Sequence, residues 1–145
     1  MILHRSLVVV ALALAALVPV RAAETDSEVD ARKTALELAG AFSNDGFKIR
    51  DGHWSGALKR GERAVVAVNL YAGNQYWFSI GAQSAKSFAV HLYDESGQPL
   101  TTENYDDEAK AAAGFAPTVS GQYFVTIGPV SDDNAGTFCL VYSYR

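Results

Sequence analysis

The chain is short of the residues from which crosslinks and catalytic sites are built. It has one cysteine, Cys139, and three histidines, and it contains no Gly-x-Ser-x-Gly motif. A single cysteine excludes an internal disulfide, so the fold depends on its packed core alone. Cys139 lies in the apolar run Thr137–Val141, which predicts a small buried hydrophobic residue rather than a nucleophile.

The low histidine count argues against hydrolytic and zinc chemistry. A nucleophilic hydrolase needs a nucleophile, a base and an orienting group, and zinc needs three or four closely spaced ligands. Beyond the N-terminal apolar segment only His53 and His91 remain. His91 alternates with Val90 and Leu92, which places it on the outer side of a strand. We therefore predict a protein that is not an enzyme.

The chain also lacks an excess of positive charge. Without Arg5 and Arg21, ten Lys and Arg residues stand against 16 Asp and Glu residues. The densest basic cluster, residues 59–63, contains Gly61 and is typical of a turn. Because an acidic surface repels phosphate backbones, we expect no nucleic-acid partner.

One long apolar run is present, and it lies at the N-terminus. Arg5 precedes the run Leu7–Val18, and Val20-Arg21-Ala22 supplies the small residues of a cleavage site. This layout is typical of a secretory signal peptide over residues 1–22. A membrane anchor is the alternative, but a spanning helix needs about 20 apolar residues. We predict a periplasmic or secreted protein with no lipid anchor and no membrane span after signal cleavage.

Residues 24–46 predict an N-terminal helical segment, with the helix running from Thr25 to Ser43. Thr25 and Glu28 have the spacing of a capping box, in which each side chain accepts a hydrogen bond from the other residue's backbone. An apolar stripe at helical spacing follows, formed by Ala31, Ala35, Leu38 and Phe42. We expect this helix to pack on the next domain, with a loosely docked arm as the alternative.

From residue 47 to residue 145 the pattern changes to short alternating apolar runs separated by turn residues. Val, Ile, Tyr, Phe and Trp alternate with polar residues between Gly, Asn and Asp clusters, which is the signal for strands. We predict about eight strands, over residues 53–58, 64–70, 75–81, 87–93, 99–104, 110–116, 122–128 and 136–144. Strands at this spacing predict an all-β fold, a two-sheet antiparallel β-sandwich or jelly roll.

Short motifs follow one another in a recognisable order over residues 53–144. They are Trp54-Ser55-Gly56-Ala57-Leu58, Leu70-Tyr71-Ala72-Gly73-Asn74-Gln75-Tyr76-Trp77-Phe78, Leu92-Tyr93-Asp94-Glu95-Ser96-Gly97, Phe115-Ala116-Pro117 and Ser120-Gly121-Gln122-Tyr123-Phe124-Val125. This series resembles the bacterial pre-peptidase C-terminal domain, a β-sandwich often appended to secreted proteases. The resemblance implies the fold and a family in which some members bind collagen, carbohydrate or calcium. Because the chain carries no protease domain, we do not expect the role of a processed protease tail.

Aromatic residues at outward positions indicate a candidate binding surface. His53 and Trp54 begin the first strand, where an exposed pair suits stacking on a sugar or a peptide, with ordinary packing as the alternative. Trp77 and Tyr93 alternate with core residues and point outward, where polar residues are the rule. We predict that His53, Trp54, Trp77 and Tyr93 bind the partner. The alternative for the face of Trp77 is that the N-terminal helix covers it.

Carboxylates gather in the segments 103–108 and 132–134. Oxygen ligands of this kind suit calcium, which members of the resembled family sometimes hold. We predict a calcium site at Asp106, Asp107, Asp132 and Asp133, with plain solvated turns as the alternative, and no other cofactor.

Together these patterns predict an exported, non-catalytic module that recognises a protein or carbohydrate partner through an aromatic surface. The alternative is a structural or inhibitory accessory protein that docks on one specific exported enzyme.

Overall fold

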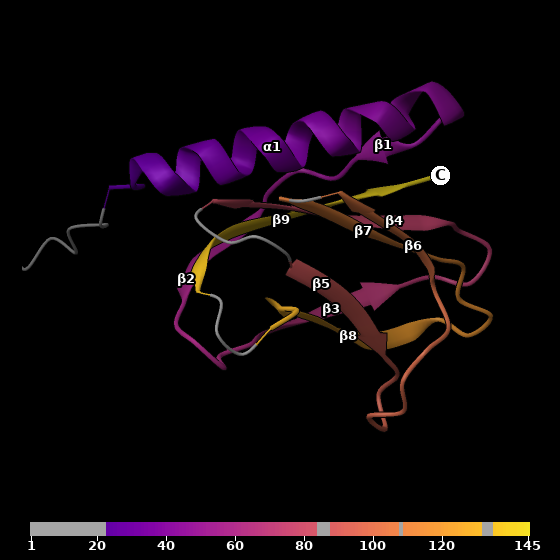
Figure 1. The fold of residues 1–145 in the computed structure, drawn as a ribbon. Coiled ribbons are helices and arrows are strands. Elements are labelled where there is room, and N and C mark those ends of the chain that lie inside the picture. The colour runs from indigo at the N-terminus through magenta and orange to yellow at the C-terminus, as the bar shows by residue number, and fades with distance from the viewer. Residues whose placement is uncertain (1–22, 84–87, 108, 132–134) are drawn as a thin grey trace, which may run out of the picture.

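The computed structural model describes residues 23–83, 88–107, 109–131 and 135–145. Within these residues the chain forms one α-helix and nine strands in two antiparallel sheets (Figure 1). The predicted all-β sandwich with an N-terminal helix is confirmed. The predicted signal peptide, residues 1–22, lies outside the described residues. No helix in the described part of the chain is long and apolar enough to cross a membrane.

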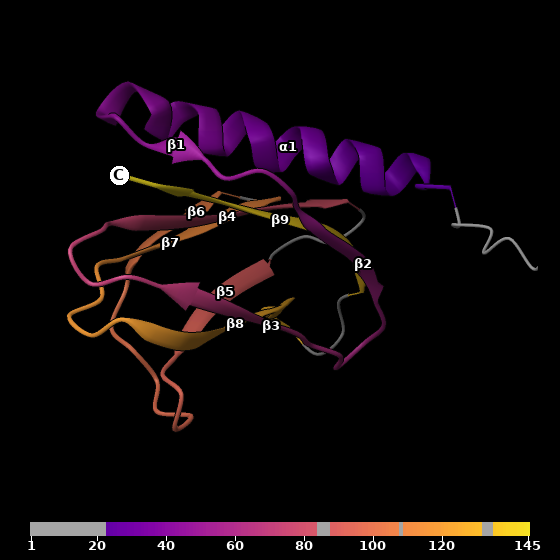
Figure 2. The ribbon, with the colours of Figure 1, turned by 180° about the vertical axis from the view of Figure 1, so that it is seen from behind.

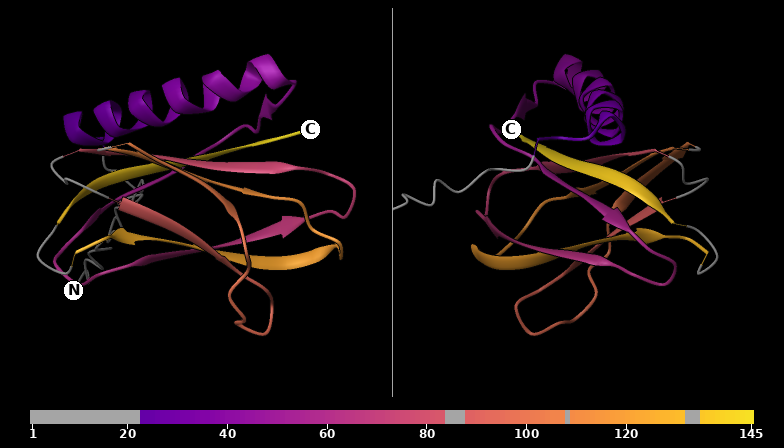
Figure 3. Two further views of the ribbon diagram at one scale, coloured as in Figure 1. Left: turned by 45° about the vertical axis from the view of Figure 1, so that its right-hand side comes forward. Right: turned by 90° about the vertical axis from the view of Figure 1, so that its left-hand side faces the viewer.

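The two sheets form two layers that lie face to face (Figure 3). The larger sheet has the order β1-β9-β4-β7-β6, with β2 also paired to β9. Its strands are β1 (Lys48–Ile49), β2 (Trp54–Leu58), β4 (Tyr76–Gln83), β6 (Glu103–Asp107), β7 (Lys110–Phe115) and β9 (Gly136–Tyr144). The smaller sheet has the order β3-β8-β5, and its strands are β3 (Ala64–Leu70), β5 (Phe88–Tyr93) and β8 (Gly121–Pro129).

The core between the sheets follows from strict alternation along the strands. The side chains predicted to share a face are buried together except Tyr144, which is 39 % exposed at the end of β9. The buried ones are Tyr76, Phe78 and Ile80 on β4, Phe88, Val90 and Leu92 on β5, Tyr123, Val125 and Ile127 on β8, and Phe138, Leu140 and Tyr142 on β9. Because side chains of a strand alternate between its two faces, the neighbours of these residues lie on the outer faces of the sandwich.

Helix α1 (Asp26–Phe42) lies across the outer face of the larger sheet, over β4 and β9 (Figures 1 and 2). The predicted capping box is present. The Thr25 amide donates to Glu28 Oε2 at 2.9 Å, and the Glu28 amide donates to Thr25 Oγ1 at 3.2 Å. A 3-10 turn, η1 (Ser43–Asp45), follows the helix, and Gly46 at φ 88° ends it. Of the two sequence-based alternatives, the structure shows the docked helix.

Small residues let α1 approach the sheet closely. A second apolar cluster joins Ala31, Ala35 and Ala39 of the helix to Cys139 and Val141 of β9. Cys139 is fully buried, as the sequence predicts. At Gly81 of β4, an added Cβ would overlap the backbone of α1 at Ala31 and Ala35, so only glycine fits this contact.

The prediction was wrong around residues 99–107. Residues 99–104 were expected to form a strand and the next strand was expected at residue 110, but β6 runs from Glu103 to Asp107. Every residue of β6 is exposed, because it is the edge strand of its sheet and charged residues are tolerated there. Pro99 forms only an isolated bridge with Tyr93.

Two smaller differences concern strand ends. The strand predicted to end at Gly81 continues as β4 to Gln83, paired with β9 as far as Thr137. The two-residue strand β1 was not predicted. A turn follows β5 at Asp94–Gly97, and hydrogen bonds from Ser96 and Gln98 lower the pKa of the Asp94 carboxyl group.

Candidate functional site: the open edges of the sandwich

The sandwich has a cleft between its sheets at each of two edges. One cleft, of about 310 Å³, joins β2 and β9 of the larger sheet to β3 of the smaller one. The other, of about 370 Å³, joins β6 and β7 to β5. Both are in the size range of small binding sites, and they differ in chemistry.

The cleft between β2 and β3 is rich in aromatic rings, and we call it the aromatic cleft. It is lined by Arg50, Trp54, Ala67, Val68, Asn69, Tyr71 and Tyr142. Trp54 is half-buried and packs against the core between the sheets. Its ring stacks on that of Tyr142, with the ring centres 5.9 Å apart and the planes 12° apart. Strand β2 therefore presents its tryptophan inside a cleft rather than on a flat face.

Arg50 lies over both rings of this stack. Its guanidinium carbon is 5.9 Å from the centre of the Trp54 ring and 5.2 Å from that of Tyr142, within the range of a cation–π contact. Two bonds hold the segment in place: the Arg50 amide donates to the Tyr142 carbonyl at 2.9 Å, and Arg50 Nη1 donates to the Asp51 carbonyl at 3.2 Å. The cleft thus has a fixed positive group above an aromatic floor.

The tyrosines of the cleft differ in exposure. Tyr71 is 62 % exposed, whereas Tyr142 is 7 % exposed. The backbone amide of Tyr71 donates to the Tyr76 hydroxyl at 2.9 Å, which fixes the chain below the exposed ring. Burial raises the pKa of the Tyr142 phenol, and the nearby Arg50 cation opposes this rise. The Tyr142 ring is therefore a neutral, buried support, and Tyr71 is the accessible ring at the rim.

His53 lies outside this lining, close to the N-terminal end of α1. Its Nε2 atom is 3.6 Å from Glu24 Oε1, which is too long for a hydrogen bond. Both oxygens of the same carboxylate accept hydrogen bonds from Arg32 Nη1, at 2.7 and 2.6 Å. His53 is exposed, and it lies beside the surface ion pair of Glu24 with Arg32.

The other two predicted binding residues lie on different faces of the sandwich. Trp77 stacks on Phe42 of α1, with ring centres 4.3 Å apart and planes 8° apart, so the helix covers it, as the alternative anticipated. Tyr93 is on the outer face of the smaller sheet, opposite Phe124 of β8. The structure therefore does not bring Trp54, Trp77 and Tyr93 together into one surface.

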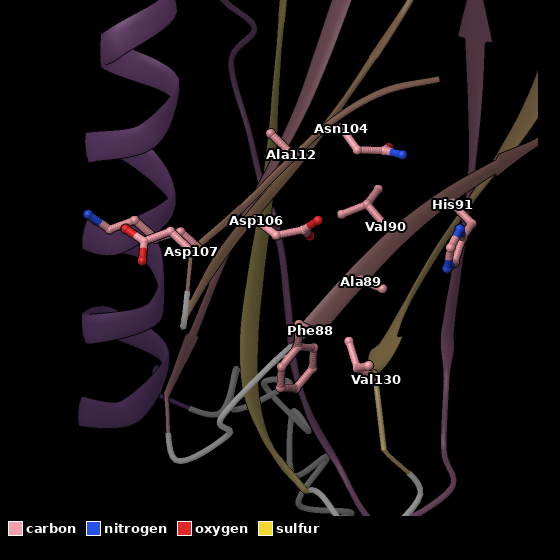
Figure 4. Close-up of a pocket in the computed structure, with 10 residues that line it drawn as sticks. Phe88, Ala89, Val90, His91, Asn104, Asp106, Asp107, Ala112 and Val130 are labelled. Atoms are coloured by element: carbon pink, nitrogen blue, oxygen red, sulfur yellow. The ribbon is translucent and has the colours of Figure 1, made fainter. Parts of the chain in front are cut away.

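The cleft between β5 and β6 contains the two predicted calcium ligands that the structure describes (Figure 4). Asp106 points toward Val90 of β5, whereas Asp107 points toward α1. Neighbouring residues of a strand face opposite sides, so these two carboxylates do not converge on one ion. The described residues hold no group of three or more His, Cys, Asp or Glu side chains that could bind a metal. Asp132 and Asp133 lie outside the described residues.

Sequence reasoning found one residue of the aromatic cleft as a binding residue, Trp54, and missed its neighbours. Arg50 precedes Trp54 by four positions. A basic residue so close to a tryptophan at the start of a strand is a sequence signal from which Arg50 could have been predicted as a binding residue. Asn69 and Tyr142 give no such signal, because they reach the cleft only through the pairing of β2 with β9 and the stacking of the two sheets.

Comparison with known proteins adds no further description of the cleft. No family model matches the chain, and no curated protein matches its sequence.

Proposed function

We propose that the protein is an exported, non-catalytic module that binds a protein or carbohydrate partner in the aromatic cleft. The observation that carries the proposal is the stack of half-buried Trp54 on buried Tyr142 beneath Arg50, with the exposed Tyr71 at the rim of the cleft. Concave sites that combine aromatic faces with a few fixed polar groups are typical of ligand recognition.

The charge of the chain segment that contains Arg50 and Trp54 supports the same proposal. Five of the ten basic residues beyond position 22 lie within residues 48–63, beside only two acidic residues, Asp51 and Glu62. The rest of the chain is strongly acidic. A basic segment on an acidic protein, with Arg50 at the cleft, favours partners that are negatively charged or rich in hydrogen-bond acceptors.

Export and the absence of catalysis are parts of the proposal that rest on other features. The N-terminal apolar run with its small-residue site supports export. The resemblance to pre-peptidase C-terminal domains supports a binding role of the kind some of those modules have. Among the residues that the structure describes, those that line the aromatic cleft include no histidine, cysteine or carboxylate, which supports recognition rather than acid–base chemistry.

The fluorescence of Trp54 tests the proposal directly. The chain has two tryptophans, Trp54 and Trp77, so the variant Trp77→Phe leaves Trp54 as the only reporter and keeps a ring against Phe42. We expect soluble polysaccharides or proteins from the extracytoplasmic fraction to shift its emission. We expect Trp54→Ala and Arg50→Ala to weaken binding by about tenfold or more each, as loss of central contacts does.

Tyr105→Ala is the matched control, because Tyr105 is 42 % exposed on β6, outside the aromatic cleft. Circular dichroism of each variant checks the fold. Unchanged binding by folded Trp54→Ala and Arg50→Ala variants would contradict the proposal. Recovery of one stoichiometric exported enzyme as the partner would support the accessory-protein alternative instead.

A further inference from the structure

Strand β3 has a free edge that faces the aromatic cleft. Among the described residues β3 pairs only with β8. The preceding strand, β2, crosses to the larger sheet and pairs with β9. In an antiparallel pair, alternate residues direct their N–H and C=O groups away from the partner strand. Half of the backbone groups of β3 are therefore left without a strand partner.

The free edge of β3 lacks the features that usually block such an edge. Its seven residues, AVVAVNL, include no charge, proline or glycine, whereas the edge strand β6 carries Glu103, Asp106 and Asp107. Natural proteins protect exposed edges with charges, prolines or bulges, because an open edge is a template for another strand. β6 is protected in this way, and β3 is not.

The same edge forms one wall of the aromatic cleft. Ala67, Val68 and Asn69 of β3 line it opposite Trp54 and Arg50. A strand added along β3 would point every second side chain between the sheets, toward the Trp54–Tyr142 stack and Arg50. Its remaining side chains would continue the outer face of the smaller sheet, beside Val65 and Ala67.

The charge around the edge selects the chemistry of the added strand. Lys59 and Arg60 lie in the turn that leads into β3, and Arg50 stands at the cleft. Arg63, in the same turn, extends over Gly128 of β8, on the side of β3 away from the free edge. Carboxylate side chains complement this arrangement, and a basic segment would be repelled.

We propose, on the basis of the proposed function, that an extended acidic peptide segment of a partner protein adds to β3 as a fourth strand of the smaller sheet. Backbone hydrogen bonds to β3 give the affinity, and the aromatic cleft with Arg50 selects the inward-facing side chains. This is recognition by strand addition. A carbohydrate would use the face of Trp54 without the backbone of β3, so the two kinds of partner leave different signatures.

The test uses a synthetic heptapeptide of alternating Glu and Val with blocked ends, added to the ¹⁵N-labelled protein. We expect the fast-exchanging amides of β3, every second residue from Ala64 to Leu70, to exchange about tenfold more slowly with peptide present, as new strand hydrogen bonds require. Peptides N-methylated at alternate residues sharpen the test. One set of methyl groups removes the donors that face β3 and abolishes binding, and the other set leaves binding intact.

Charge reversal provides the matched pair of protein variants. Arg50→Glu is expected to weaken peptide binding by about tenfold. Lys33→Glu also replaces a positive charge by a negative one, but on the exposed side of α1, and it is expected to leave peptide binding unaltered. Unchanged exchange of the β3 amides at saturating peptide, or equal binding of both N-methylated sets, would overturn the inference. Protection of the same amides that grows with protein concentration alone would also overturn it, because the occupant would then be a second copy of the chain.

Failure of the inference and failure of the proposed function are distinguishable. If an oligosaccharide shifts Trp54 emission but the peptide leaves β3 exchange unchanged, the aromatic cleft binds a ligand and strand addition is wrong. If the peptide protects β3 equally in the Trp54→Ala variant, strand addition occurs and the role of the aromatic cleft is wrong.

Discussion

The two outer faces of the sandwich differ in how they are covered. Beneath α1, the larger sheet presents Ser79, Gly81 and Ser143, all buried, together with the apolar Cys139 and Val141. The smaller sheet presents Val65, 62 % exposed, and Phe124 opposite Tyr93. Both faces carry apolar side chains, so residue type at outward positions does not reveal which face a helix will cover.

A close steric fit to α1 distinguishes the covered face. The backbone of α1 approaches β4 closely enough that Gly81 has no room for a methyl group, and Ala31, Ala35 and Ala39 supply the matching small surface on the helix. Close approach multiplies the number of van der Waals contacts per residue. The larger residues Phe42 and Trp77 close the contact at the C-terminal end of the helix.

The largest loss of stability is expected from Gly81→Ala, which adds a methyl group directly beneath α1 on the covered face. The new Cβ would overlap helix backbone at Ala31 and Ala35, so α1 must shift away from the sheet. We expect a loss of about 3 kcal/mol in the free energy of unfolding, at the upper end for overpacking a buried contact, measured by urea denaturation. Gly121→Ala, where an added Cβ meets nothing within 4 Å, is the control. Equal losses in the two variants would show that the helix is not closely docked.

A smaller effect is expected from a matched pair of valines, one on each face. Val141 is 1 % exposed beneath α1, and Val65 is 62 % exposed on the open face. Val141→Thr buries a hydroxyl and is expected to cost about 1–3 kcal/mol, whereas Val65→Thr should stay within about 0.5 kcal/mol. Thermal unfolding of the two variants measures the contrast. A large loss from Val65→Thr would mean that the open face is covered in solution.

The smallest effect is a pH dependence that belongs to the covered face. Burial raises the pKa of the Cys139 thiol above its ordinary value of 9.0. The folded protein therefore holds this proton more tightly than the unfolded chain does, so the stabilisation is complete below pH 9 and declines as the pH rises above it. Tyr142 adds a decline of the same sign above its ordinary pKa of 10.0. Denaturation midpoints recorded from pH 8 upward should fall in the native chain. The decrease in the midpoint between pH 9 and 10 should be smaller in Cys139→Ala. An equal decrease in both proteins would show that groups other than Cys139 cause the pH dependence.

Local signals were enough to predict several elements from the sequence. The capping box of Thr25 and Glu28 depends on residues three apart, and it is present as predicted. The bounds of β3 and β9 match the predicted ranges 64–70 and 136–144, because clean alternation between turn residues encodes a strand locally.

The features that the sequence could not reveal depend on distant neighbours. The acidic composition of β6 is typical of a loop, and only its pairing with β7 makes it a strand. Trp77 alternates outward in β4, but its coverage depends on a helix about forty residues earlier. The aromatic cleft joins Trp54 to Tyr142 because β2 pairs with β9, a register that no local pattern encodes.

Strand β9 has a consequence for the order of events in folding. It pairs with β1, β2 and β4 and lies beneath α1, so the earliest elements of the described chain depend on residues about a hundred positions later. Most of the stability of a helix in a protein comes from tertiary packing, and the docking surface of α1 is complete only when β4 and β9 are both in place. Contacts of such long sequence separation slow folding to roughly milliseconds or seconds. We therefore expect α1 to gain stable structure only in the final, cooperative step, when the two ends of the sequence meet.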